Sequence, residues 1–122
     1  MKIPKFEAQT EWVKPTEFPD LRQVEEIAID LETKDPDLIK KGSGSVIGNG
    51  EVIGIAVATK HFKGYFPIAH EGGGNMDRTR VLSWLKDILE APSTKVFHNA
   101  IYDVCWLRAM GFKINGDIAC TM

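Results

Sequence analysis

Two carboxylates, Asp30 and Glu32, stand out because they interrupt a run of otherwise apolar residues. Side chains two residues apart in a strand point to the same face, so both carboxylates would project together. Adjacent carboxylates repel each other, and burial makes each costly to ionise. A hard divalent cation such as Mg²⁺ or Mn²⁺ removes this conflict by taking oxygen ligands from both. The alternative is a solvated strand end without a catalytic role.

A second pair, Asn99 and Asp103, lies four residues apart at the start of an expected helix, which places both on one face. Asn99 suits the N-cap position. Apolar residues surround the pair, so we expect this helix to be mostly buried, and a buried Asp needs a metal or a hydrogen-bond network. Because the preceding strand is short, we expect the helix to start beside the sheet, where Asp103 would face Asp30. Three converging carboxylates would suit two-metal phosphoryl transfer. The alternative is a helix cap with a surface Asp.

Other chemically suggestive residues give weaker signals. His70 lies in a glycine-rich loop and could be a ligand or a base, although loop histidines are more often polar surface. The glycines at 72–74 lack the spacing and the Lys-Ser/Thr of a phosphate-binding loop. Cys105 lies among apolar residues and is interpreted as a small core residue. No nucleophile–base arrangement is evident.

The composition predicts one globular domain. The chain has 122 residues, of which 43% are hydrophobic and 26% are charged. Fifteen basic and seventeen acidic residues give a net charge of −2, which excludes a protein that coats nucleic acid by bulk charge. Two cysteines are too few for a disulfide scaffold or a four-ligand zinc site, and they favour a reducing intracellular compartment. We expect no membrane-spanning helix and no signal peptide.

Periodicity and turn signals predict an α/β domain with a mixed sheet. The expected segments are an irregular arm over 1–24, strands over 26–32, 51–59 and 65–69, a helix from Asp77 to Leu89 that Pro92 stops, a strand over 95–97, a helix over 99–110 and a strand over 114–118. A loop with turns occupies 34–50. The order is therefore β-β-β-α-β-α-β, and the first three strands are expected to form an antiparallel meander.

At this point the motifs match a family. The sequence Ile-Ala-Ile-Asp-Leu-Glu-Thr at 27–33 resembles the first motif of the DEDD 3′–5′ exonucleases. Phe-His-Asn-Ala-Ile-Tyr-Asp at 97–103 resembles their second motif, Asn-x-x-x-Asp. Gly-Tyr-Phe-Pro-Ile-Ala-His at 64–70 and the stretch at 106–111 resemble the proofreading domain of family A DNA polymerases. Phage-type versions are most similar, with Phe-Pro-Asp-Leu at 18–21 leading into the exonuclease.

The resemblance implies a ribonuclease H-like fold and removal of mismatched 3′ nucleotides from DNA during DNA replication. Carried over by residue, Asp30, Glu32 and Asp103 would be the catalytic ligands of two Mg²⁺ or Mn²⁺ ions. Asp30 would bridge both ions, Glu32 would also help position the attacking water, and Asp103 would hold the second ion. Thr33 and Asn99 would help bind the terminal nucleotides.

The sequence departs from the family pattern at its end. The third motif, which supplies a fourth carboxylate and usually a Tyr or His general base, would lie some tens of residues beyond the second. The family usually has Asp-Thr-Met where this sequence has Cys-Thr-Met at 120–122. We therefore expect 25–122 to be the N-terminal part of an exonuclease domain, truncated at its C-terminus, with an incomplete metal site and weak or no activity in isolation.

The implied partners are a single-stranded 3′ end of DNA and the remainder of the polymerase chain, in the cytoplasm of a phage-infected or bacterial host cell. Self-association is also expected, because truncation would leave an apolar patch partly uncovered at Trp106, Leu107, Met110 and Phe112. The alternative is a stable monomer in which the N-terminal arm folds across this surface. Two alternatives stay open. One is a non-catalytic nucleic-acid-binding or assembly module with the same fold. The other is an RNA-trimming relative, against which the stretch at 65–70 argues.

Overall fold

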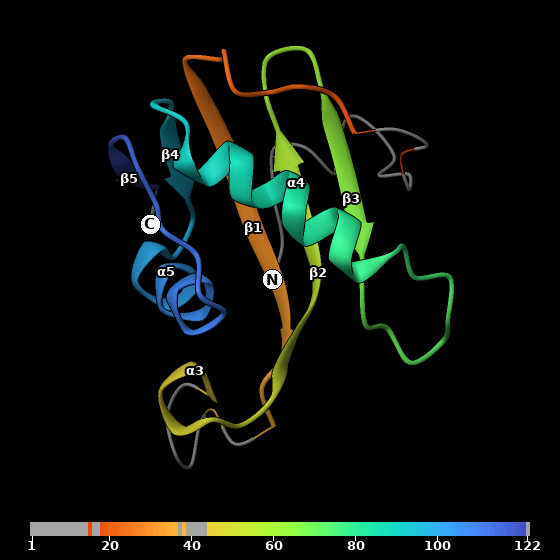
Figure 1. The fold of residues 1–122 in the computed structure, drawn as a ribbon. Helices are drawn as coiled ribbons and strands as arrows, with labels where there is room; N and C mark the ends of the chain where they lie inside the picture. Colours follow the sequence, from red (N-terminus) through yellow and green to blue (C-terminus); the bar gives the residue numbers. More distant parts are fainter. Residues whose placement is uncertain (1–14, 16–17, 37, 39–43, 122) are drawn as a thin grey trace.

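The computed structural model describes residues 15, 18–36, 38 and 44–121, and it has the predicted α/β architecture (Figure 1). The elements are β1 (Glu26–Lys34), α3 (Gly44–Ile47), β2 (Glu51–Ala58), β3 (Lys63–Pro67), α4 (Arg78–Glu90), β4 (Thr94–Phe97), α5 (Ala100–Ala109) and β5 (Ile118–Cys120). This set of elements is compatible with a ribonuclease H-like fold. None of the described helices is both long and apolar enough to span a bilayer.

The five strands form one mixed sheet in the order β3-β2-β1-β4-β5. The β1, β2 and β3 strands pair antiparallel, which confirms the predicted meander. The β1 strand also pairs parallel with β4, and β4 pairs parallel with β5. Because β1 lies at the centre of the sheet, any group on it is surrounded by neighbouring strands. The β1–β2 register shifts between Glu32 and Thr33, and such bulges re-aim side chains.

One face of the sheet packs against α4 and forms the core (Figure 1). The β1 strand contributes Ile27, Ile29 and Leu31 to this α4 face, and the helix contributes its apolar stripe, which includes Leu85 and Leu89. Burying one such side chain stabilises the fold by roughly 1.5–3 kcal/mol. The helix begins as predicted, because the Asp77 carboxylate accepts hydrogen bonds from two backbone amides in the first turn.

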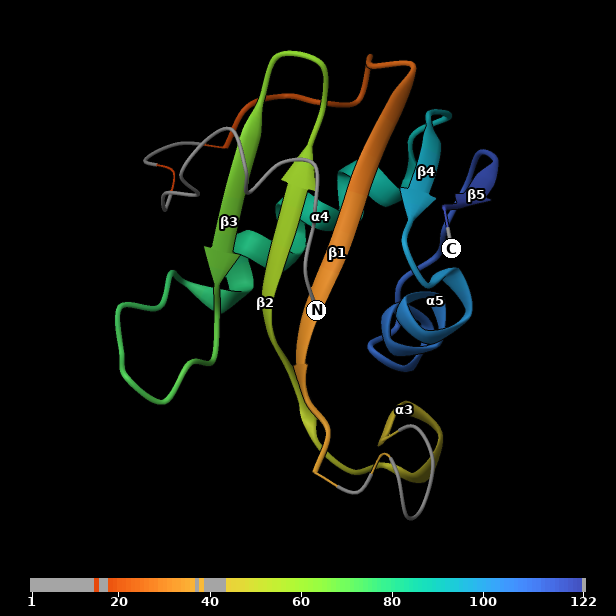
Figure 2. The same cartoon turned by 180° about the vertical axis from the view of Figure 1, so that it is seen from behind.

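The opposite face carries small residues and carboxylates, and we call it the carboxylate face. Its members include Ala28, Asp30, Glu32, Gly54, Ala56 and Tyr65. Figure 2 shows this side, where none of the described helices lies in front of β1, β2 and β3. Both ribbon views place α5 beyond the carboxyl end of β4 and beside β1.

Several strand boundaries differ from the prediction, and hydrogen bonds explain two of the differences. The last strand starts at Ile118 instead of 114, because the Asn115 amide and side chain donate to the Leu89 and Glu90 carbonyls, each at 2.8 Å. These bonds hold the preceding segment against the end of α4 and away from the sheet. The third strand ends at Pro67, since the next two backbone amides both donate to the Ile53 carbonyl.

The predictions for the loop over 34–50 and for the arm over 1–24 had different outcomes. The expected loop over 34–50 contains the short helix α3, which lacks a periodic pattern and was therefore missed. Within the expected arm, residues 15 and 18–24 have no regular helix or strand. The rest of that arm lies outside the described residues.

The expectation of a mostly buried α5 was wrong. Only Asp103, Trp106 and Leu107 are buried in this helix, whereas Ile101 is 82% exposed. Apolar residues occupy several faces of α5, but only one stripe of the helix packs against the rest of the domain. Cys105, expected in the core, is half-buried for the same reason.

The expected uncovered patch on this helix is also largely absent. Trp106 is 6% exposed and Leu107 is fully buried. Both belong to the core cluster, and the segment after the helix folds back over them, with the Phe112 amide donating to the Leu107 carbonyl. Met110 and Phe112 are half-buried against the same cluster. The apolar surface on which self-association was predicted is therefore smaller than expected.

Candidate active site

Asp30 and Asp103 meet where α5 starts beside the central strand. Pairing between β1 and β4 ends at Ala28 and Val96, so β1 continues past its neighbour and the first turn of α5 lies alongside it. Asp30 is 8% exposed and Asp103 is fully buried. Within the described part of the chain, the Asp30 Oδ1 atom and both Asp103 carboxyl oxygens have no hydrogen-bond partner. The structure brings Asp103 near enough to Asp30 for their charges to interact, as predicted.

Burial and mutual repulsion shift the titration of both groups. Burial raises the pKa of Asp30 to about 6, and the neighbouring Glu32 charge raises it further, while His98 opposes the shift. Burial raises the pKa of Asp103 to about 7, and the Asp30 charge adds to this effect. The Leu31 amide lies near Asp103 and lowers its pKa, but it does not make a well-aligned hydrogen bond. Paired carboxyls with raised pKa values are characteristic of functional sites.

Glu32 lies on the same face but is exposed and turned toward another partner. It pairs across the sheet with Gly54, and its carboxylate lies near the Tyr65 hydroxyl, whose pKa is raised by burial and by this charge. No group of three or more His, Cys, Asp and Glu side chains suited to hold one metal ion occurs among the residues with a described placement. The structure therefore joins Asp30 with Asp103, and it leaves Glu32 beside them without completing a three-carboxylate cluster.

The donor set nevertheless fits a hard divalent cation. The orphaned oxygens of Asp30 and Asp103 are carboxylate donors in a buried position, which is the ligand type that Mg²⁺ and Mn²⁺ prefer. A cation between them would offset both the repulsion and the desolvation that raise their pKa values. No lysine or arginine takes this role, since the electrostatic neighbours of the pair among the described residues are carboxyls, His98 and a backbone amide.

The two predicted nucleotide-binding residues flank this pair. The Thr33 hydroxyl lies 2.9 Å from the Tyr102 hydroxyl, so the bulge after Glu32 turns Thr33 toward α5. Asn99 occupies the N-cap position of α5, as expected, but its side chain makes no capping hydrogen bond. The side-chain amide of Asn99 therefore makes no capping hydrogen bond to the helix that begins after it.

Sequence reasoning missed a polar network beside the site. The Asp35 carboxylate accepts hydrogen bonds from the Tyr102 hydroxyl at 2.8 Å and from the Gly44 amide at 3.0 Å. Together with the Thr33 contact, this network ties the end of β1 and the start of α3 to α5. The signal available in the sequence was the tyrosine that precedes Asp103, whose ring must be accommodated close to the site.

His70 was considered as a ligand or base, and the structure gives it a protein partner instead. Its Nε2 atom lies 2.5 Å from the Tyr65 hydroxyl. Tyr65 was not singled out from the sequence, because its position relative to Glu32 depends on the strand register, which periodicity alone does not reveal.

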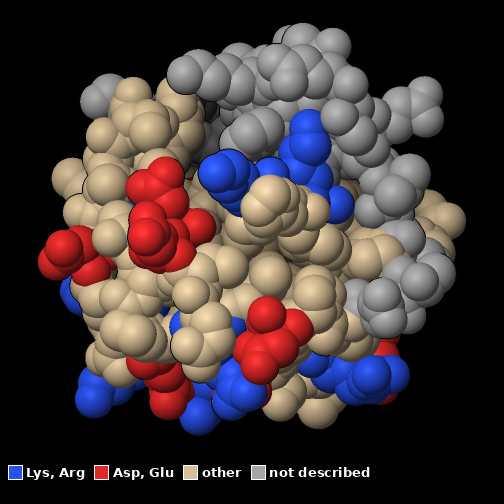
Figure 3. Space-filling model, turned by 90° about the horizontal axis from the view of Figure 1, so that it is seen from above, with Lys and Arg blue, Asp and Glu red and all other residues tan. Residues whose placement is uncertain are grey.

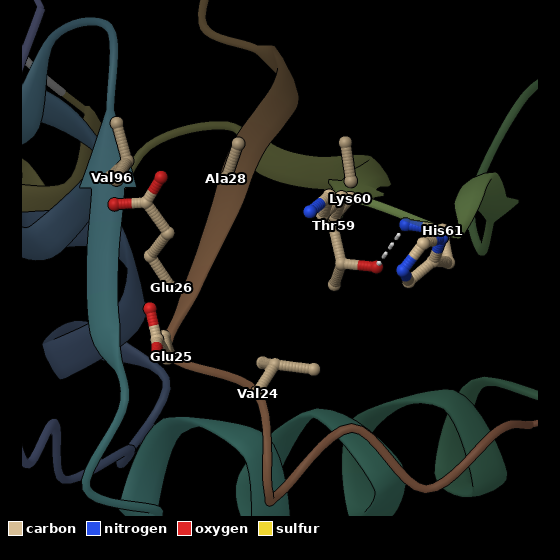
Figure 4. Close-up of a pocket in the computed structure, with 9 residues that line it drawn as sticks. Val24, Glu25, Glu26, Ala28, Thr59, Lys60, His61 and Val96 are labelled. Atoms are coloured by element: carbon tan, nitrogen blue, oxygen red, sulfur yellow. Dashed lines mark hydrogen bonds between the residues drawn. The ribbon is translucent and has the colours of Figure 1, made fainter.

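A separate pocket of about 940 Å³ lies at the opposite end of β1 and contains none of the predicted site residues. Figure 4 shows the Glu25 and Glu26 carboxylates on one side of it and Lys60 and His61 on the other. Figure 3 views the molecule from this end, and its described surface carries patches of both signs. Such a surface does not provide the uniformly positive field that attracts a phosphate backbone.

One comparison relates the chain to a known protein. No protein-family model matches the sequence. The chain is 41% identical over 114 residues to a protein of Pseudomonas phage M6 described as a DNA-directed DNA polymerase, and the alignment covers 85% of the chain. The chain spans 16% of the length of that polymerase. It is thus related to one region of a phage DNA polymerase.

Proposed function

Starting from this relationship, we propose that the chain is part of a 3′–5′ exonuclease domain attached to a DNA polymerase. The domain would hydrolyse the 3′-terminal nucleotides of DNA and so proofread the growing strand. The observation that carries the proposal is the buried pair of carboxylates, Asp30 and Asp103, in which Asp30 Oδ1 and both Asp103 oxygens have no hydrogen-bond partner in the described part of the chain. Such a pair lowers the stability of the fold, and a divalent-cation site in a DNA-processing enzyme would explain why it is present.

Each residue has a role that follows from its position. Asp30 and Asp103 would bind the divalent cations through their orphaned oxygens. Mg²⁺ or Mn²⁺, when bound, lowers the pKa of a water ligand and stabilises the charge on the phosphate. Glu32, exposed on the same face, would accept a hydrogen bond from the attacking water and orient it toward phosphorus.

The substrate would lie along α5 and the end of β1. The Asn99 side chain, which does not cap its helix, is available to hydrogen-bond the terminal nucleotide. The Thr33 hydroxyl, which lies 2.9 Å from the Tyr102 hydroxyl, would contact the same nucleotide. Because the chain corresponds to 16% of the phage polymerase, the remaining ligands and DNA contacts would come from the rest of a polymerase chain.

A second candidate is a non-catalytic DNA-binding or assembly module with the same fold. One observation favours it: over the described ranges, no three metal-ligating side chains form a group suited to one ion. Such a module would bind single-stranded DNA without a metal requirement and would not hydrolyse it.

Release of nucleotides from a 5′-labelled single-stranded DNA separates the two candidates. We would compare the chain alone with the chain joined to the segment that follows the matched region in the phage M6 polymerase. The joined protein should shorten the DNA from its 3′ end only when Mg²⁺ or Mn²⁺ is present. Asp30→Asn should reduce this rate at least 1,000-fold, whereas Asp87→Asn, at an exposed position of α4, should not change it.

Two results would overturn the exonuclease assignment. One is equal trimming by the Asp30→Asn variant and the wild type. The other is metal-independent DNA binding by both proteins without any trimming, which would establish the non-catalytic module.

A further inference from the structure

The Tyr65 side chain extends from β3 over β2 toward Glu32 on β1. Gly54 on β2 leaves the space for it. Tyr65 pairs with Ala56, and Gly54 pairs with Glu32, so all three strands contribute to one patch of the carboxylate face. A Cβ atom placed on Gly54 would lie 1.8 Å from the Tyr65 hydroxyl oxygen. The hydroxyl therefore lies directly over the Gly54 backbone, an approach that only glycine permits.

The Tyr65 hydroxyl has polar groups on two sides. Its oxygen lies 2.5 Å from His70 Nε2, and the two rings meet edge to face with centroids 5.7 Å apart. Burial raises the pKa of the Tyr65 hydroxyl, and the nearby Glu32 carboxylate raises it further. Since a carboxylate can only accept, the phenol is the donor in any hydrogen bond between the two groups. The phenol oxygen is then the acceptor for an Nε2–H donor of His70.

His70 is itself held by the glycine-rich loop that contains it. The His70 amide donates to Asn75 Oδ1 at 2.8 Å, and Asn75 Nδ2 donates to the His70 carbonyl at 3.0 Å. An ion pair between Glu71 and Lys34 attaches the loop to the end of β1. This loop therefore fixes the backbone from which the imidazole reaches Tyr65.

We propose that Tyr65, supported by His70, is a positioning residue that holds the Glu32 carboxylate in place on the carboxylate face beside Asp30. The consequence for catalysis rests on the proposed function, because it matters only if Glu32 orients the attacking water. An exposed Glu side chain otherwise samples several rotamers, and hydrogen bonds from a supporting residue restrict it. Removing such support typically costs 10–100-fold in metal affinity or activity.

The kinetic test uses the exonuclease-competent protein of the preceding subsection. Tyr65→Phe keeps the ring and removes the hydroxyl, and it should lower the turnover number about 10-fold with KM for DNA unchanged. His70→Ala should have a smaller effect, of about 3-fold, because it removes only the support for the phenol. His70→Gln should restore most of that loss, since its amide N–H can replace Nε2–H. His61→Ala, at an exposed position of the β2–β3 turn, is the matched control.

A second readout does not depend on activity. The side-chain ¹⁵N shifts of His70 should change in Glu32→Gln and in Tyr65→Phe, while those of His61 should stay the same. An unchanged His70 shift in both variants would overturn the proposal, and so would wild-type turnover by Tyr65→Phe. If the wild-type protein trims no DNA but the His70 shifts still change in the two variants, the exonuclease function would be refuted. The position assigned to Tyr65 would then still be supported.

Discussion

The two faces of the sheet use the same strands for opposite purposes. Toward α4, β1 presents Ile27, Ile29 and Leu31, none of which is more than 2% exposed. Toward the other side, the same strand presents Asp30 and Glu32, and its neighbours offer small residues in place of a packed core. Because side chains alternate along a strand, one run of seven residues builds both surfaces.

This difference shows where the fold gains and loses stability. The α4 face buries large apolar side chains and stabilises the domain. The carboxylate face buries two acidic groups that repel each other, and three of their four carboxyl oxygens lack hydrogen-bond partners among the described residues. A face that lowers stability in this way is expected to be kept for function. Substitutions on the two faces should therefore have opposite consequences.

The largest effect on stability should come from the α4 face. Leu85→Ala removes a fully buried side chain and should lower the free energy of unfolding by about 3 kcal/mol. Leu82→Ala, at a half-buried position of the same helix, should cost clearly less. Urea unfolding followed by circular dichroism measures both. If the two variants lost the same stability, the core would not be where the structure places it.

Gly54→Ala tests the close contact on the carboxylate face. The added methyl would lie 1.8 Å from the Tyr65 hydroxyl and 2.4 Å from the ring carbon that carries it, so the ring must move. We expect a loss of about 2 kcal/mol, measured by urea unfolding. Gly72→Ala should be nearly neutral, because nothing lies within 4 Å of its Cβ position. A full Gly54→Ala penalty in a Tyr65→Ala background would contradict the contact, since the two effects must couple.

The buried carboxyl pair should make stability fall as pH rises. Asp30 and Asp103 titrate near 6 and 7 when folded, against an ordinary value of 3.8, so the folded state holds more protons between about pH 4 and 7. Without added divalent cations, the free energy of unfolding should decrease by about 2 kcal/mol between pH 5 and pH 6. Asp103→Asn should flatten this dependence. An equally steep decrease in the variant would assign the effect to other groups.

Asp20 provides a contrast of opposite sign. Its hydrogen bonds with Arg22 lower its pKa to about 2. That pair therefore contributes stability that is lost only below about pH 4, outside the window assigned to the buried carboxyls. A single urea series over pH 3–8 separates the two effects.

Local pattern predicted much of the fold and the centre of the site. Alternation located β1, and the apolar stripe located α4, because burial on one side dictates both patterns. Asp103 could be placed next to Asp30 because a short strand leads directly into the helix that carries it. These features depend on contacts between near neighbours in the sheet.

The features that were missed depend on tertiary contacts. The start of β5 is set by hydrogen bonds from Asn115 to the end of α4, which no periodicity encodes. The exposure of Ile101 follows from the one stripe along which α5 packs. The Tyr65–Glu32 contact requires the register of three strands and a glycine at the crossing point. Alternation along a strand predicts which face of the sheet a residue occupies, but it does not predict which residue lies opposite it on the neighbouring strand.

The most direct test of the account is Mn²⁺ binding by the carboxylate pair, measured by titration calorimetry at pH 8. The wild-type chain should bind Mn²⁺, and the ion should raise its melting temperature, because a ligand that prefers the folded state stabilises it. Asp103→Asn should bind at least 10-fold more weakly and gain no stability, while Asp87→Asn should behave as the wild type. Equal Mn²⁺ binding by the wild type and Asp103→Asn, or none by the wild type, would contradict a cation site at Asp30 and Asp103.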